Sequence, residues 1–229
     1  QTTTTKLMSF GVVFPGQGSQ RVGMLEEAAG AFSVVSDTFF EASEALGYDL
    51  WQLVSQGPAE KLGLTEYTQP AILTASVALF RAFTEANAFQ PVAGAGHSLG
   101  EYSALVSAGT LSLADGVRLV RQRGAAMQDA VPVGVGAMAV VMGLDDDVVT
   151  DTCNSVSTAD SFVGGVNFNA PGQVVIAGHS AAVDSAVAAL KDAGARRAMP
   201  LPVSAPFHTP LMQPAAEVMQ QAFEDVSWS

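Results

Sequence analysis

The pentapeptide G-H-S-L-G at residues 96–100 constrains the fold more than any other segment. The short apolar run 92–96 precedes the serine and predicts a strand, and the pattern over 99–107 predicts a helix after it. A serine at so tight a strand-to-helix turn needs a strained backbone, and the two flanking glycines leave room around it. The segment predicts an exposed nucleophile, Ser98. The alternative is an ordinary helix N-cap serine, which the same five residues also allow.

Strand and helix patterns alternate on both sides of this turn. Residues 9–14 predict a strand, which the loop P-G-Q-G at 15–18 closes. Residues 69–89 predict a helix with Pro70 in its first turn, and 113–128 predict another. The buried face expected for the first of these helices consists of Ile72, Leu73, Val77, Phe80 and Phe83. Alternating strands and helices indicate an α/β fold with a parallel sheet.

A different order of elements follows between residues 134 and 204. The expected segments are a strand at 137–144, a helix at 147–156, strands at 162–168 and 174–177, a helix at 181–193 and a strand at 198–203. The order β-α-β-β-α-β predicts a ferredoxin-like subdomain over 134–204. This subdomain is expected as an insertion in a larger domain made of residues 8–133 and 205–229.

Composition and charge exclude several classes of protein. Hydrophobic residues make up 48% and charged residues 14%, which excludes intrinsic disorder. The formal charge of −12 argues against nucleic acid as a partner. The single cysteine, Cys153, forms no internal disulfide or metal site and fits a reducing cytoplasm. The apolar run 131–144 is too short for a membrane helix and predicts a buried strand, and the first seven residues lack the features of a signal peptide.

A nucleophilic serine needs a base, and the chain has three histidines to offer. His97 adjoins Ser98 and is expected to pack locally, because neighbours at a turn point in different directions. His179 ends a predicted strand, where a surface or half-buried structural role is favoured. His208 follows S-A-P-F at 204–207, where the chain should return to the first domain, and it is the candidate base. A purely structural His208 is the alternative.

The glycine loop and an arginine cluster complete the candidate chemistry. Gly16 and Gly18 do not belong to a dinucleotide motif, because the third glycine position is occupied by Arg21. The loop is better suited to lend a backbone N–H to an oxyanion hole. Arg118, Arg121 and Arg123 lie on one predicted helix, where a solvated face is the simplest interpretation. Arg123 differs from the other two, because small residues follow it and leave room for a carboxylate ligand.

Four spaced motifs together resemble one enzyme family. They are F-P-G-Q-G-S-Q at 14–20, G-H-S-L-G-E-Y at 96–102, R-Q-R-G at 121–124 and P-F-H at 206–208. In this order they are similar to the malonyl-CoA:acyl carrier protein transacylases of bacterial fatty acid synthesis. The resemblance runs from about Met8 to the end of the chain, and it implies an α/β-hydrolase-like large domain with a ferredoxin-like insertion.

The resemblance also implies a role for each motif. Ser98 would carry the malonyl group, and His208 would act as base and then as acid in a ping-pong transfer. The backbone N–H groups of Gln17 and Leu99 would form the oxyanion hole, and Arg123 would bind the malonyl carboxylate. Malonyl-CoA and acyl carrier protein are the implied substrates of a cytoplasmic monomer. No cofactor, metal, membrane or nucleic acid is implied.

The chain departs from the family pattern at its C-terminus. Family members continue beyond Trp228, and that part normally carries the carbonyl that orients the base. Glu217 and Glu224 lie on a predicted helix and do not replace it. Two alternatives stay open: a serine esterase or phospholipase-type hydrolase, which shares the serine turn, and an inactive fragment that binds CoA or a carrier protein because the C-terminal part is absent. The exposed cations expected to bind an acidic carrier protein are Lys191, Arg196 and Arg197, or Lys61.

Overall fold

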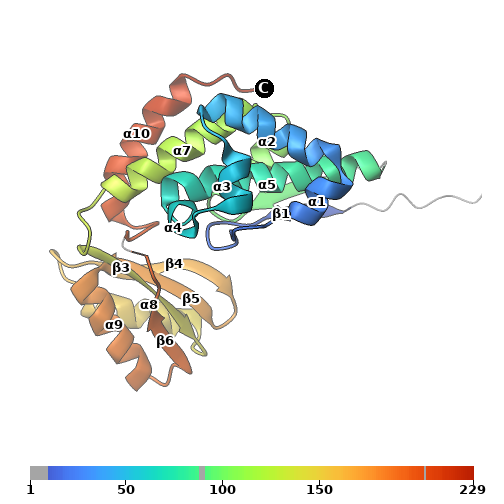
Figure 1. Ribbon diagram of the computed structural model, residues 1–229. Coiled ribbons are helices and arrows are strands. Elements are labelled where there is room, and N and C mark those ends of the chain that lie inside the picture. The colour runs from blue at the N-terminus through green and yellow to red at the C-terminus, as the bar shows by residue number, and fades with distance from the viewer. Residues whose placement is uncertain (1–9, 88–90, 204) are drawn as a thin grey trace, which may run out of the picture. The chain divides into compact units, whose positions relative to one another are not determined.

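The computed structural model describes residues 10–87, 91–203 and 205–229, and Figure 1 shows its elements. It divides into two compact units. The first contains the described residues up to Ala125 together with Gln221–Ser229, and the second is Ala126–Gln220. Among the described residues, no helix is both long and apolar enough to cross a membrane.

The first unit combines a parallel strand pair with helices. Strand β1 (Gly11–Phe14) pairs in parallel with β2 (Ala93–Gly96), and Phe14 lies opposite Gly96. The helices are α1 (Glu26–Ala31), α2 (Ser33–Leu46), α3 (Leu50–Gln56), α4 (Ala59–Leu62), α5 (Thr65–Ala86), α6 (Gly100–Ser107) and the larger part of α7 (Leu113–Asp129). This arrangement confirms the α/β class and the parallel strands expected from the sequence.

Helix α5 is the central helix of this unit, and it differs from the prediction at both ends. It begins at Thr65, so Pro70 lies inside the helix and the prediction of a first-turn proline was wrong. The Leu64 carbonyl accepts bonds from the next turn, at Tyr67 and Thr68, and so starts the helix upstream of the proline. The predicted face is buried at residues 72, 73 and 77, but Phe83 is 43% exposed. The predicted end at 89 lies outside the described residues.

The second unit has the element order that the sequence predicted. Its elements are β3 (Gly136–Met142), α8 (Asp146–Val156), β4 (Val163–Ala170), β5 (Gln173–His179), α9 (Ser180–Asp192) and β6 (Arg197–Pro200). The strands form an antiparallel sheet in the order β4-β5-β3-β6. The two helices bury Val149, Cys153 and Leu190 with Ile176 of β5 in one core cluster. The expectation of a buried strand over all of 131–144 was wrong, because a turn precedes β3 and leaves Val133 81% exposed.

After β6 the chain passes through a short 3₁₀ helix, Pro210–Met212, into α10 (Gln213–Glu224). The compact unit extends beyond residues 134–204 on both sides. Met127 before that segment, and Phe207 and Met212 after it, pack in one cluster with Met138 of β3. Burial of these apolar side chains holds the flanking segments to the sheet.

Candidate active site

The turn between β2 and α6 has the strained geometry that the pentapeptide predicted. Ser98 has a φ of +54°, in the left-handed region that serine rarely adopts. A Cβ at position 96 would lie 1.9 Å from the carbonyl carbon of Gly100, and a Cβ at position 100 would lie 2.3 Å from the Phe14 carbonyl oxygen. Both positions therefore require glycine. The N-cap position of α6 is Leu99, so the alternative of Ser98 as the helix N-cap was wrong.

The glycine loop after β1 packs directly against this turn. The His97 N–H donates to the Phe14 carbonyl over 3.0 Å, and a Cβ on Gly16 would lie 2.7 Å from the His97 carbonyl oxygen. Next along the loop, the Gln17 side chain donates to Thr65 Oγ1 over 3.3 Å. Within the described residues, the backbone N–H groups of Gln17 and Leu99 donate to no other backbone group.

Arg123 reaches the serine from α7. Its Nη2 donates to Ser98 Oγ over 3.1 Å, and its Nη1 donates to Gln69 Oε1 over 2.9 Å. The next residue, Gly124, makes this approach possible, because a Cβ there would lie 2.5 Å from the Thr65 carbonyl oxygen of α5. The structure therefore unites Ser98 and Arg123, which the sequence placed in separate motifs.

Arg123 is a half-buried cation whose hydrogen bonds go to the neutral side chains of Gln69 and Ser98. Burial lowers the pKa of the Arg123 guanidinium, and nearby Tyr102 and Glu101 oppose this shift. The ion pairs found between described side chains, Arg81 with Glu41 and Arg118 with Asp115, do not include Arg123. A half-buried guanidinium that forms no ion pair with a described carboxylate is suited to bind an anionic ligand.

The other two arginines of the cluster have a different role. Arg118 Nε donates to the Ala45 carbonyl over 3.1 Å, and Arg121 Nη1 donates to the Leu46 carbonyl over 3.3 Å. Both residues thus hold the C-terminal end of α2, rather than forming only a solvated face. Their hydrogen bonds satisfy carbonyls that a helix end leaves without partners.

Sequence reasoning missed two side chains of this site. Gln69 is 1% exposed and fixes one side of the Arg123 guanidinium. The sequence pattern predicts a helix that starts at this residue, whereas α5 begins four residues earlier and buries it. The Tyr102 ring lies 5.7 Å from Arg123 Cζ, measured to the ring centroid. Its signal in the sequence was its place at the end of the motif 96–102, but the motif does not show that the ring contacts Arg123.

The three histidines have distinct surroundings. His97 packs at the turn as expected. His179 Nδ1 accepts a hydrogen bond from the Phe162 N–H over 2.9 Å, which confirms its structural role. His208 belongs to the second unit, where it is exposed with a φ of +63° between buried Phe207 and Thr209.

Comparison with known families decides the class of the protein. The family described as "Acyl transferase domain" matches residues 12–228. The chain belongs to the acyl transferase family. It is therefore an acyltransferase, as the motifs indicated.

Curated relatives within this family have a common name. The malonyl CoA-acyl carrier protein transacylase of Escherichia coli (strain K12) is 58% identical over 211 residues, which cover 92% of this chain and 68% of that protein. The one of Salmonella typhimurium (strain LT2) is 55% identical over 223 residues, covering 97% of this chain and 72% of that protein. These matches confirm the family resemblance stated from the four motifs.

Solved structures agree in fold with this acyltransferase. The malonyl CoA-acyl carrier protein transacylase from Coxiella burnetii has a TM-score of 0.95 at 48% identity, covering 97% of this chain and 70% of that chain. A second match is a chain in the structure of a type II PKS acyl-carrier protein in complex with its malonyl-transacylase. It has a TM-score of 0.94 at 53% identity, and the match covers 97% of this chain and 72% of that chain.

Proposed function

We propose that this acyltransferase moves a malonyl group from CoA to the phosphopantetheine thiol of an acyl carrier protein through an ester on Ser98. One observation carries the proposal: the half-buried guanidinium of Arg123 donates a hydrogen bond to the hydroxyl of a strained turn serine. The serine supplies the nucleophile, and the cation supplies a site for the free carboxylate of a malonyl group. The names of the near relatives support the same substrates.

The first half-reaction forms the ester. Ser98 Oγ bonds to the thioester carbonyl carbon while its proton passes to the His208 imidazole, and the carbon–sulfur bond breaks. The imidazolium then gives the proton to the departing CoA thiolate. In the second half-reaction the carrier thiol loses its proton to His208 and attacks the ester, and Ser98 regains its hydroxyl proton.

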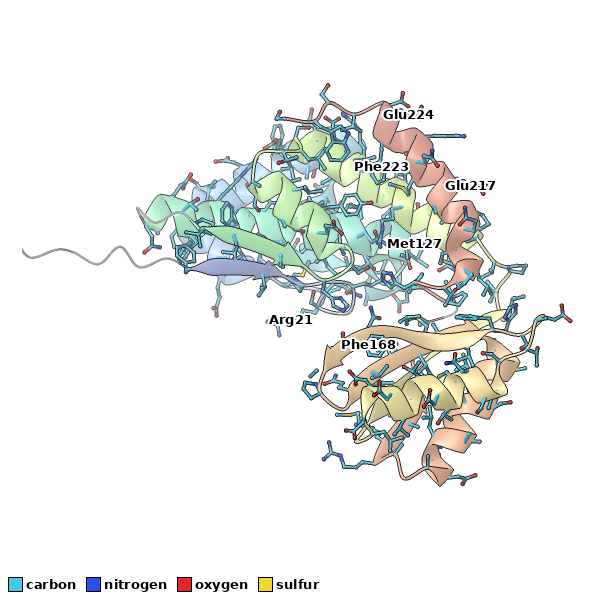
Figure 2. All side chains as sticks on the ribbon, turned by 180° about the vertical axis from the view of Figure 1, so that it is seen from behind. Arg21, Met127, Phe168, Glu217, Phe223 and Glu224 are labelled. Atoms are coloured by element: carbon cyan, nitrogen blue, oxygen red, sulfur yellow. The ribbon has the colours of Figure 1, made fainter. Side chains whose placement is uncertain are left out.

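His208 is the base in this proposal because of its local backbone. Its neighbours Phe207 and Thr209 are buried, and Thr209 Oγ1 donates to the Pro206 carbonyl over 2.6 Å. This turn keeps the imidazole exposed in a fixed backbone conformation. Glu217 and Glu224 lie on α10, as expected, and Figure 2 labels both on that helix.

The oxyanion hole in this proposal consists of the backbone N–H groups of Gln17 and Leu99. Two features support it: neither group donates to another backbone group in the described chain, and the Gly16 loop touches the serine turn. Leu99 also stands at the N-terminus of α6, where the helix dipole favours negative charge. Loss of one such donor typically lowers kcat by about 10²- to 10³-fold.

The acyl carrier protein is acidic in this proposal and needs a basic surface on the enzyme. We assign carrier-protein docking to the exposed cations Lys191, Arg196 and Arg197, with Lys61 as the second candidate.

The proposal also includes the domain division. The larger domain, 8–133 with 205–229, is α/β-hydrolase-like, and 134–204 is a ferredoxin-like insertion. The enzyme acts as a cytoplasmic monomer without a cofactor.

Intact-mass spectrometry tests the proposed function. The chain and a Ser98→Ala variant are incubated briefly with malonyl-CoA, and with acetyl-CoA as the control acyl donor. We expect a malonyl adduct on the wild-type chain alone, and its loss when a carrier protein with a free phosphopantetheine thiol is added.

Two results would contradict the proposal. Rapid loss of malonyl-CoA to free CoA without carrier protein would indicate a hydrolase. A folded chain that forms no adduct would indicate a fragment that only binds CoA or a carrier protein. Circular dichroism of the same samples shows whether the chain is folded.

A further inference from the structure

Tyr102 links the serine turn to the guanidinium of Arg123. It lies on α6, four residues after Ser98, and its ring centroid is 5.7 Å from Arg123 Cζ on α7. We infer that Tyr102 is a positioning residue that holds the Arg123 guanidinium in the orientation needed to bind the carboxylate of the acyl group. This inference rests on the proposed function of the same site.

The guanidinium is fixed by three neutral partners, one on α5, one on α6 and one in the turn that precedes α6. Gln69 of α5 accepts from Nη1 over 2.9 Å, and Ser98 accepts from Nη2 over 3.1 Å. The Tyr102 ring provides the third contact without accepting a hydrogen bond from the guanidinium edge. An aromatic face stabilises a cation through its quadrupole, and this contact strengthens when the cation is desolvated.

The choice of an aromatic partner has a chemical consequence. An acidic side chain at this place would neutralise Arg123 and compete with an incoming carboxylate. The neutral ring limits the rotation of the guanidinium but leaves its positive charge available. Burial raises the pKa of the Tyr102 hydroxyl, so the ring stays neutral at physiological pH.

The Tyr102 ring is itself held by an aromatic cluster near the end of the chain. It stacks on Phe223 of α10, labelled in Figure 2, with ring centroids 6.4 Å apart and planes inclined by 29°. Trp228 packs edge-on against Phe223 at 5.9 Å, and its indole N–H donates to the Phe223 carbonyl. Residues 221–229 thus support the ring that contacts Arg123, and all of these residues belong to the first compact unit.

Rates of Ser98 acylation by malonyl-CoA and by acetyl-CoA provide the test. We expect Tyr102→Leu to lower the malonyl rate about tenfold with little effect on the acetyl rate, because an acetyl group has no carboxylate to bind. Tyr102→Phe keeps the ring and should retain the malonyl rate. Tyr48→Leu is the matched control, because Tyr48 contacts Arg121 of the same helix at 5.4 Å.

The ratio of the two rates separates positioning from a general structural role. Equal losses of the malonyl and acetyl rates in Tyr102→Leu would overturn the inference, and so would no change in either rate. Loss of the malonyl preference in Tyr48→Leu would overturn it as well.

A second measurement needs no turnover. Hydrogen exchange of the Arg123 Nε–H is followed by NMR, with the signal assigned through Arg123→Lys. The inference predicts exchange at least about tenfold faster in Tyr102→Leu than in the wild type or in Tyr48→Leu. If the wild type forms no malonyl adduct, the proposed function fails, and this exchange rate still decides the positioning role. Equal rates in all three proteins would overturn that role.

Discussion

Glycines close to Ser98 fix the geometry of the site residue by residue. The positions without room for a side chain are Gly16, Gly96 and Gly100, where an added Cβ would lie 2.7, 1.9 and 2.3 Å from backbone atoms. These contacts bring the loop after β1 and the N-terminus of α6 together around one hydroxyl. A side chain at any of the three positions must displace backbone, because no flexible group is available to move.

We expect Gly96→Ala to destabilise the protein by about 3 kcal/mol and to abolish acylation of Ser98. Gly30→Ala is the control, since Gly30 lies in α1 with open space around it and alanine favours a helix. The midpoints of urea unfolding of both variants are compared with that of the wild type. Equal midpoints for the two variants would contradict this account of the turn.

The residues of the site were predictable to different degrees. Ser98 and Arg123 stand in motifs whose chemistry is visible in the sequence. Tyr102 stands in the same motif as Ser98, but its contact with Arg123 was not predicted, and neither was that of Gln69, because both contacts depend on how α5, α6 and α7 pack together. Gly124 allows α7 to approach α5 closely, because a Cβ there would lie 2.5 Å from the Thr65 carbonyl oxygen. From the sequence alone, this glycine indicates only that there is room for a ligand.

At the scale of elements, periodicity was a good guide where each element had clear end signals. The order of the second unit was predicted because Gly172 and Gly194 mark turns, and both have positive φ. The start of α5 was missed because Pro70 suggested a first turn. A proline inside a helix removes one backbone bond, here the one that residue 70 would donate to the Glu66 carbonyl.

Cys153 on α8 offers a test of the packing of the second unit. The residue is 1% exposed, and burial raises the pKa of its thiol to about 11. The folded pKa exceeds the unfolded value, so folding disfavours the thiolate. The free energy of unfolding should therefore fall as pH rises from about 9 toward 11.

Thiol labelling measures this directly. At pH 8 we expect Cys153 to react with iodoacetamide at least about a hundredfold more slowly in the native protein than in urea, because the reactive thiolate is suppressed. Rapid labelling of the native chain would show that α8 does not bury this side chain against the sheet.

At the scale of the whole molecule, the first unit presents an apolar groove beside β1. The groove has a volume of about 650 Å³ and is lined by apolar side chains that include Val12, Val13, Leu79, Phe80 and Phe83. Val13 is 83% exposed, and β1 pairs only with β2 among the described strands. Open apolar strand edges promote association between chains.

The enzyme is proposed to be a monomer at working concentration, and we expect only weak association of the wild type at high concentration. Val13→Lys should lower this association, because charge on an edge strand opposes pairing with a second edge. Val133→Lys is the matched control, since Val133 is 81% exposed but lies in a turn of the second unit. Static light scattering at increasing protein concentration compares the two variants with the wild type. A similar decrease for both variants would indicate a general effect of charge.

In the proposed function, Arg123 selects the acyl group that Ser98 receives. The most direct measurement is a competition between equimolar malonyl-CoA and acetyl-CoA, in which the two Ser98 esters are quantified by mass spectrometry. We expect malonyl to dominate on the wild type, and Arg123→Ala to lose that preference by about 10²-fold, with Arg121→Ala unchanged. An Arg123→Ala chain that still prefers malonyl would contradict the central claim.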